Sequence, residues 1–313
     1  MKKLKSYILL ALCAVLCLTL CACGGQDADG SPSPSDSTSP SDSTSPSDST
    51  APSTEPSETP SADNTPISVY TNAYFAPFEY YDGTDIVGVD VDVMNLVGEK
   101  LNRQVTYTNV EFGVIIDTVS AGSLADVGAA GITITDSRKE QVDFSNPYFT
   151  SVQYVIYPAG AMTPDGTDGD VSYILWNSLA GKKIGVQADT TGDIYVGGEI
   201  SGEDFDGVLK DTGAEEVRYD NAQLAADAVG AGQVDVVVVD YLPASFIVDK
   251  NQGYECAALY YDNGDGTVAP TEEQYAICVT KGQDELLTAI NEVLSELGED
   301  GINDLVMKHM GLE

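Results

Sequence analysis

The stretch 127–148 reads VGAAGITITDSRKEQVDFSNPY, and the fold prediction starts from it. Its first eight residues, Val127–Ile134, are small or apolar apart from Thr133, which predicts a buried strand. A polar segment that contains Arg138 follows directly. In sheets of mainly parallel strands, ligands bind beyond the carboxyl ends of the strands. We therefore expect Thr133 and Arg138 to belong to a binding site.

Predicted strands and helices alternate on both sides of this stretch. Apolar runs predict strands over 67–71, 105–110, 183–186 and 234–239. Apolar residues at helical spacing predict helices over 91–101, 115–121, 224–229, 286–297 and 302–310, and another helix that starts at Thr191. This alternation is typical of an α/β fold with mainly parallel sheets. Asp240 directly follows the run 234–239, so it also lies at the carboxyl end of a strand.

Residues 1–22 predict a secretory signal peptide. Three of the first five residues are lysines, and the apolar run Ile8–Leu20 is shorter than the ~20 residues that a membrane-spanning helix needs. The run ends in Leu20-Cys21-Ala22-Cys23, which resembles the lipobox of bacterial lipoproteins, where the last cysteine carries the lipid. We expect lipidation of Cys23 and a location on the extracellular face of the cell membrane. The alternative is ordinary cleavage that leaves Cys23 as a free thiol.

Residues 23–65 predict a disordered linker between this cysteine and the folded part. The hexapeptide SPSDST at Ser33–Thr38 recurs at Ser39–Thr44 and Ser45–Thr50. No aromatic or large aliphatic residue follows Cys23 in this segment, so folding has nothing to offset the entropy of ordering it. The segment is expected to be a tether or a neutral spacer.

The composition excludes several classes of partner. The chain has 14 basic and 50 acidic residues and a net charge of −36, which opposes binding to nucleic acid and to anionic lipid surfaces. Cys256 and Cys278 in the folded part leave a disulfide or two buried thiols open. One histidine, His309, and no metal-ligand spacing predict no metal site, and no cofactor is expected.

Six segments in a fixed order suggest a family. They are NAYFAPFEY at 72–80, VGVDVDV at 87–93, GITITDSR with VDFSNPY at 131–148, KKIGVQADTTG at 182–192, GQVDVVVVD at 232–240, and YAI at 275–277. Together they resemble the bacterial extracellular solute-binding proteins of family 3, receptors for polar amino acids. The resemblance covers nearly all of 66–312.

The resemblance implies a two-lobed clamshell of the type II periplasmic-binding-protein kind. The chain would cross between the lobes twice, near Val155–Pro158 and near Gln274–Ile277. Lobe 1 would comprise 66–156 and 276–313, and lobe 2 would comprise 157–275.

The resemblance also assigns ligand-binding residues. Arg138 matches the arginine that holds the ligand carboxylate, a task that suits its planar fork of donors. Asp240 matches the aspartate that holds the ammonium group, and a buried carboxylate is costly unless it is paired. The remaining matched positions are Asn72, Phe75, Phe112, Gly131, Thr133, Thr190 and Thr191. The alternatives are a surface turn for Arg138, core packing for the two phenylalanines, and helix capping for Thr190 and Thr191.

Two departures from the family pattern bear on specificity. Receptors for basic amino acids often carry aspartate where Asn72 stands, and the loop before Thr190 usually has glycine where Asp189 stands. We therefore expect a neutral polar ligand such as glutamine or cystine. The function implied is the substrate-binding component of an ABC importer, a monomer without enzymatic activity that closes its lobes on the ligand and docks on a membrane permease.

Two other functions fit the same fold. One is an exported dehydratase for prephenate or arogenate, for which Glu199 and Glu203 are acids without a distinctive spacing. The other is a solute-sensing module associated with the cell wall.

Overall fold

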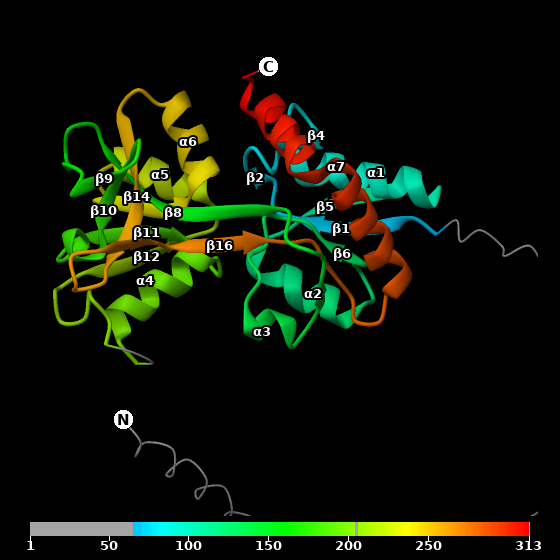
Figure 1. Ribbon diagram of the computed structural model, residues 1–313, viewed down its shortest axis with the longest axis horizontal. Coiled ribbons are helices and arrows are strands. Elements are labelled where there is room, and N and C mark those ends of the chain that lie inside the picture. The colour runs from blue at the N-terminus through cyan, green and yellow to red at the C-terminus, as the bar shows by residue number, and fades with distance from the viewer. Residues whose placement is uncertain (1–64, 204–205, 313) are drawn as a thin grey trace, which may run out of the picture. The chain divides into compact units, whose positions relative to one another are not determined.

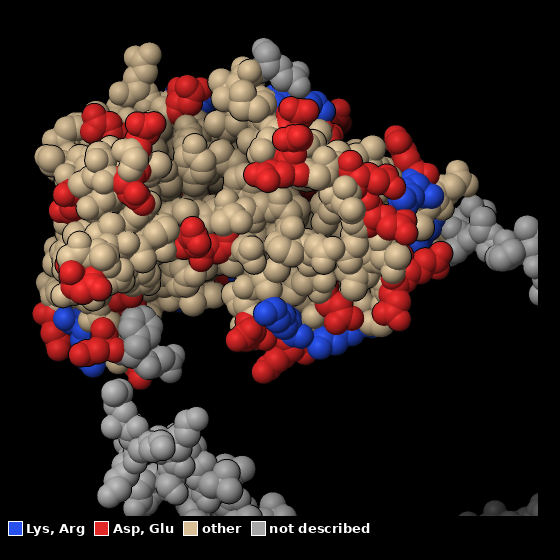
Figure 2. Space-filling model, viewed as in Figure 1, with Lys and Arg blue, Asp and Glu red and all other residues tan. Residues whose placement is uncertain are grey.

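The computed structural model describes residues 65–203 and 206–312. The predicted signal peptide, the predicted lipidation site Cys23 and the predicted linker up to residue 64 lie outside the described residues. Within the described part, no helix combines the length and apolar character that crossing a membrane requires. Acidic side chains are spread over both halves of the face shown in Figure 2.

The first half of the fold is built on a five-stranded sheet. Its order is β5 (Val105–Asn109), β1 (Ile67–Thr71), β6 (Val127–Gly128), β17 (Cys278–Val279) and β7 (Asp143–Phe144). Strand β1 is parallel to β5 and β6, whereas β17 is antiparallel to both of its neighbours. The other elements of this half are β2 (Tyr74–Phe75), β3 (Glu79–Asp82), β4 (Asp85–Val87), α1 (Val89–Leu101), the 3-10 turn Phe112–Val114, α2 (Ile115–Ala121), α3 (Asp136–Lys139) and α7 (Asp284–Met310).

The second half is built on a nine-stranded sheet. Its main path is β12 (Glu215–Tyr219), β11 (Lys183–Gln187), β13 (Val236–Asp240), β8 (Phe149–Pro158), β14 (Tyr254–Asp262), β10 (Val171–Leu175) and β9 (Gly166–Asp168), with β15 (Val268–Pro270) on β14 and β16 (Glu272–Tyr275) on β8. Its helices are α4 (Thr191–Ser201), α5 (Ala222–Gly230), α6 (Tyr241–Lys250) and the 3-10 turn Trp176–Leu179. All five residues of β13 are buried, as its run of valines predicts.

Two antiparallel strands, β8 and β16, connect the halves (Figure 1). They pair from Phe149 opposite Tyr275 to Val152 opposite Glu272. The predicted two-lobed α/β fold with two crossings is confirmed. Residues 155 and 156 of β8 pair with β13 and β14 inside the nine-stranded sheet, and the expected position of the first crossing, near Val155–Pro158, stays a prediction. The lobe limits at 156/157 and 275/276 stay a prediction.

One predicted element is largely wrong. The strand expected over 127–134 ends after two residues, at Gly128. The chain turns at Gly131, whose φ of 54° is left-handed and whose N–H donates to the Asp90 carboxylate over 2.9 Å. Small apolar residues signal burial, and here the buried backbone is satisfied by a side chain instead of a strand partner.

The C-terminal helices and the cysteines follow the prediction more closely. The two predicted helices are the two parts of α7, which is kinked at Gly298 with a left-handed φ of 59°. Cys256 and Cys278 are free thiols in strands of different sheets, so the disulfide alternative is not formed. Burial raises the pKa of Cys256 to about 11 and that of Cys278 to about 12.

Candidate functional site

The structure brings eight of the nine predicted ligand-binding residues to one small cavity. Its volume is about 10 Å³, which is room for about one water molecule. Its lining consists of Asn72, Phe75, Phe112, Ala130, Gly131, Thr133, Gln187, Thr190, Thr191 and Asp240, which come from both halves of the fold. The ninth predicted residue, Arg138, contacts two of these lining residues.

Arg138 is a buried cation next to this cavity, with an exposed fraction of only 7%. Nη1 donates to the Thr133 carbonyl oxygen over 2.9 Å, and Nη2 donates to the Asp189 carbonyl oxygen over 3.0 Å. The guanidinium carbon lies 5.4 Å from the centre of the Phe112 ring, within the range of a cation–π contact. The described residues give this guanidinium no carboxylate in hydrogen-bond contact, and burial lowers the pKa of Arg138. The surface-turn alternative therefore does not fit.

Asp240 is the buried anion of the same cavity, with an exposed fraction of 5%. It is the last residue of β13, so its side chain lies at the carboxyl end of the strand. The Tyr275 hydroxyl donates to Oδ1 over 2.6 Å. A buried anion thus lines the cavity, and a buried cation contacts two residues of its lining, without an ion pair between the two.

The N-terminus of α4 faces the cavity through two threonines. Thr190 caps the helix, because its Oγ1 accepts from the N–H of Asp193. Thr191 Oγ1 is buried and, among the described residues, has no hydrogen-bond partner. A buried hydroxyl left unpaired costs about 1–3 kcal/mol, so a ligand atom that pairs with it would recover stability. Capping and ligand contact are therefore compatible here.

Gly131 lets the ring of Phe75 approach the backbone. A Cβ atom at position 131 would lie 2.9 Å from Cε1 of Phe75, closer than side chains normally pack. The ring of Phe75 also lies near Tyr275, with their centres 6.4 Å apart. Phe75 is thus part of the core and part of the cavity wall at once.

Asn72 and Gln187 meet across the two halves of the fold. The Gln187 amide donates from Nε2 to Asn72 Oδ1 over 3.1 Å, and Asn72 Nδ2 donates to the Val110 carbonyl oxygen over 2.7 Å. The other side of the Gln187 amide, Oε1, accepts from the backbone N–H of Ala222. Two neutral amides, hydrogen-bonded to each other, therefore form part of the cavity lining.

Asp189 adopts a left-handed backbone conformation with φ of 64°. Glycine adopts this conformation without strain, which gives a physical reason why the family pattern usually has glycine at this position. The N–H of Asp189 donates to the Asp193 carboxylate over 2.7 Å, and its carbonyl accepts from Arg138. Its exposed carboxylate lies so close to Gly113 that a Cβ atom at position 113 would collide with it.

Sequence reasoning missed two polar residues at this site, Gln187 and Glu273. Gln187 ends β11, and the rule that found Asp240 at a strand end applies to it equally. Glu273 lies on β16, where exposed and buried residues alternate up to the buried Tyr275. Glu273 could have been found by counting back two residues from Tyr275, if 271–275 had been predicted as a strand. Apolar and polar residues do not alternate in this segment, so the sequence does not suggest a strand there.

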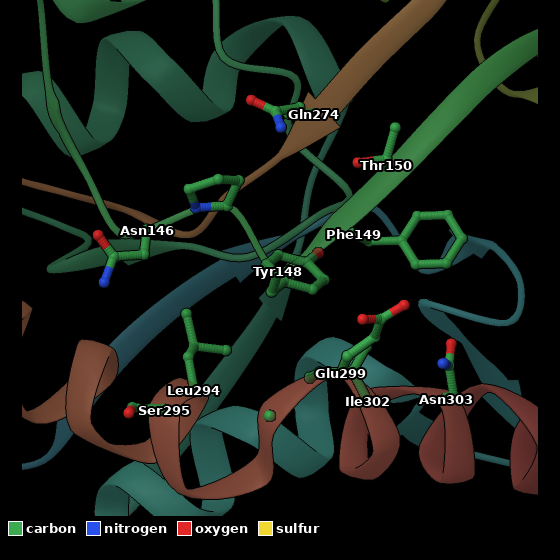
Figure 3. A pocket seen from close by; sticks show the side chains of 12 residues that line it. Asn146, Tyr148, Phe149, Thr150, Gln274, Leu294, Ser295, Glu299, Ile302 and Asn303 are labelled. Carbon is green, nitrogen blue, oxygen red and sulfur yellow. The ribbon is translucent and has the colours of Figure 1, made fainter.

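A larger hollow lies beside the crossing strands. It has about 660 Å³ and is drawn in Figure 3, where Glu299 and Asn303 rise from the kinked α7 toward β8 and β16. Its lining contains Glu299 but no lysine or arginine. No lysine or arginine lines the smaller cavity either, but the guanidinium of Arg138 contacts two of its lining residues, Thr133 and Phe112, so the smaller cavity is the better candidate for a carboxylate.

The comparisons with known proteins agree with this geometry. The sequence pattern of bacterial extracellular solute-binding proteins, family 3, matches residues 67–311, and the chain belongs to that family. A probable histidine-binding protein of Neisseria gonorrhoeae is 28% identical over 97% of this chain and 94% of the relative. An L-arginine-binding protein of Pseudomonas aeruginosa is 29% identical over 77% of this chain and 85% of the relative.

A solved structure supports the same conclusion. An ancestral arginine-binding protein bound to arginine has a TM-score of 0.63 and 33% identity, and the match covers 79% of this chain and 98% of that protein. The proteins named here are binding proteins. The two acids considered for a dehydratase do not line the cavity: Glu199 is buried and accepts from the N–H of Val208, and Glu203 is exposed.

Gly131→Ala should destabilise the protein more than Gly232→Ala. Both glycines have left-handed φ values, of 54° and 67°, which cost about 1–2 kcal/mol for other residues. Only position 131 adds a contact with Phe75, since nothing lies within 4 Å of a Cβ at position 232. Urea denaturation should show the larger loss for Gly131→Ala, and equal losses would contradict the close approach of Phe75.

Proposed function

We propose that this protein is the extracellular substrate-binding component of an ABC importer and that it binds an amino acid in the cavity between its lobes. The observation that carries the proposal is the buried Arg138, which lacks a carboxylate partner among the described residues and contacts Thr133 and Phe112, two residues of the cavity that Asp240 also lines. Leaving a buried charge unpaired is costly, and an amino acid supplies a carboxylate for one residue and an ammonium group for the other.

The remaining groups fit this division of roles. The ligand carboxylate would take the unused N–H groups of Arg138, the Thr191 hydroxyl and the N-terminus of α4, which favours negative charge. The ammonium group would lie at Asp240. Phe75 and Phe112 would enclose the aliphatic part of the ligand.

The ligand side chain is proposed to be polar and neutral, as in glutamine or cystine. Asp240 is the only acidic residue that lines the cavity in the described part of the chain, and the ammonium group would occupy it. The amides of Asn72 and Gln187 offer donors and acceptors but no charge. The names of the relatives make arginine and histidine the competing ligands.

Binding is proposed to proceed by closure of the lobes. The contacts that join residues of the two halves include Arg138 with Asp189, Asn72 with Gln187, and the ring of Tyr80 with that of Phe246, whose centres are 6.0 Å apart. A ligand held from both sides favours the closed state by the difference in its affinity for the two states. The closed form would then dock as a monomer on the permease.

A thermal-shift panel of the twenty amino acids and cystine tests the function and the ligand class. A ligand that binds only the native state stabilises it by about 2.7 kcal/mol at 100 times its Kd. Glutamine or cystine should raise Tm more than arginine, lysine or histidine. A larger shift with a basic amino acid would contradict the neutral preference, and no shift with any amino acid would contradict the function.

Arg138→Ala should weaken binding of the best ligand in that panel by about 2–5 kcal/mol, because it leaves the ligand carboxylate unpaired. Isothermal titration calorimetry measures the change. Lys139→Ala is the matched control, since Lys139 is the next residue and its side chain is 56% exposed. Unchanged affinity in a folded Arg138→Ala protein would show that the carboxylate is bound elsewhere.

A lipid anchor at Cys23 is proposed to hold the protein on the extracellular face of the membrane, with the Ser-Pro-Asp segment as its tether. In cells fed labelled palmitate, the wild-type protein should take up label and Cys23→Ala should not. Cys21→Ala is the matched control and should keep the label. An unlabelled wild-type protein would refute the anchor.

A further inference from the structure

Glu273 is a buried carboxyl group beside the proposed site, and the roles given above do not use it. It lies in the short strand β16 with an exposed fraction of 5%, whereas its neighbours Glu272 and Gln274 are exposed. Its partners are neutral: the Thr133 hydroxyl donates to Oε2 over 2.6 Å, and Gln153 Nε2 donates to Oε1. No cation among the described residues makes a hydrogen bond to it.

The second carboxyl group of this cluster is Asp240. Asp240 is paired with Gln153 in the register of β13 and β8, and Gln153 also donates to Glu273, so the two acids have Gln153 as a common neighbour. Burial is the largest cause that raises the pKa of Glu273, followed by the charge of Asp240 and a hydrogen bond to that residue. Two buried carboxyl groups can share a hydrogen bond only if one of them carries a proton.

The charged and titratable groups that face this pair come from several elements. Arg138 of α3 acts on both acids through its positive charge. Tyr275 of β16 and Tyr195 of α4 interact with both acids, and Glu79 of β3, whose own pKa is raised by burial, lies near Asp240. The acids therefore outnumber the single cation, which favours retention of a proton in the cluster.

We propose that Glu273 and Asp240 share one proton in the ligand-free protein and that the ammonium group of the bound amino acid displaces it. This inference rests on the proposed function. The proton leaves the carboxyl oxygen for the solvent buffer, and the pair becomes a dianion as the ligand brings one positive charge. The net charge of the cluster is therefore unchanged by binding.

The same arrangement sets the direction of the Thr133 hydroxyl. Thr133 has one proton, and it donates this proton to Glu273. The oxygen of Thr133 can then only accept from a ligand in the cavity. Thr133 would thus serve the ammonium group together with Asp240, and the ligand carboxylate would be left to Arg138 and α4.

The sign of the pH dependence follows from proton release. A ligand that expels a proton binds more tightly as pH rises, by up to about tenfold per pH unit for one proton. The affinity stops increasing once the pH is high enough that the pair holds no proton in the ligand-free protein, because no proton then remains to be displaced.

Calorimetry in two buffers tests the proposal with the best amino acid of the panel. Phosphate and imidazole buffers differ in ionisation enthalpy, so a released proton makes the measured binding enthalpy differ between them. The wild type should release close to one proton, and Glu273→Gln should release close to none. Glu272→Gln is the matched control, since this exposed neighbour lies on the other face of the strand, and it should behave as the wild type.

A second measurement needs no ligand. A carboxyl group whose folded pKa is raised contributes stability below its unfolded pKa, and this contribution is lost as pH rises through the folded pKa. Glu273→Gln stays neutral, so its stability relative to the wild type should increase from pH 4 to pH 8, while that of Glu272→Gln should stay level. The buried Glu79 is present in every variant and cancels in the comparison.

The outcomes separate the two proposals. Amino-acid binding without proton release, or a flat stability difference between Glu273→Gln and the wild type, refutes the shared proton and leaves the binding function intact. Failure of every amino acid to bind refutes the binding function and the displacement together.

Discussion

The antiparallel pairing of β8 with β16 is the constraint on which the rest of the structure depends. Four residue pairs, from Phe149 opposite Tyr275 to Val152 opposite Glu272, hold these two strands together where the chain passes between them and β7 and β17 of the five-stranded sheet. The same two strands carry Gln153, Glu273 and Tyr275, which support the acids at the cavity. The two strands that connect the halves therefore also carry the polar side chains that contact the acids of the site. A change in the twist of these strands would shift the two halves and these side chains together.

The protein has a large excess of acidic residues, yet its proposed binding site depends on one buried arginine. The net charge of −36 keeps the exterior negative, while Arg138 is buried against Phe112 and two backbone carbonyl oxygens. Neutral contacts of this kind satisfy donors without cancelling charge. The ligand class follows from what remains: an anion for Arg138 and a cation for Asp240, which a zwitterion provides in one molecule.

The sequence predicted the parts of the fold whose pattern is local. The apolar run Ile67–Thr71 was enough to predict a strand, and the helical spacing of apolar residues was enough to predict α1. The order of six segments predicted the family and the two lobes. The strand over 127–134 failed because Gly131 and a side-chain bond from Asp90 are tertiary features. Eight predicted site residues meet at one cavity because strand ends converge, whereas Glu273 was missed because its inward direction depends on a strand without an apolar pattern.

The left-handed backbone conformation of Asp189 bears on how the ligand preference of this receptor can evolve. Its backbone conformation is one that glycine adopts freely, and its exposed carboxylate lies against Gly113 at the edge of the cavity. One nucleotide change turns an aspartate codon into a glycine codon. A lineage can therefore remove both the strain and a negative charge beside Arg138 in a single step, which makes this loop an accessible route to new ligand preferences.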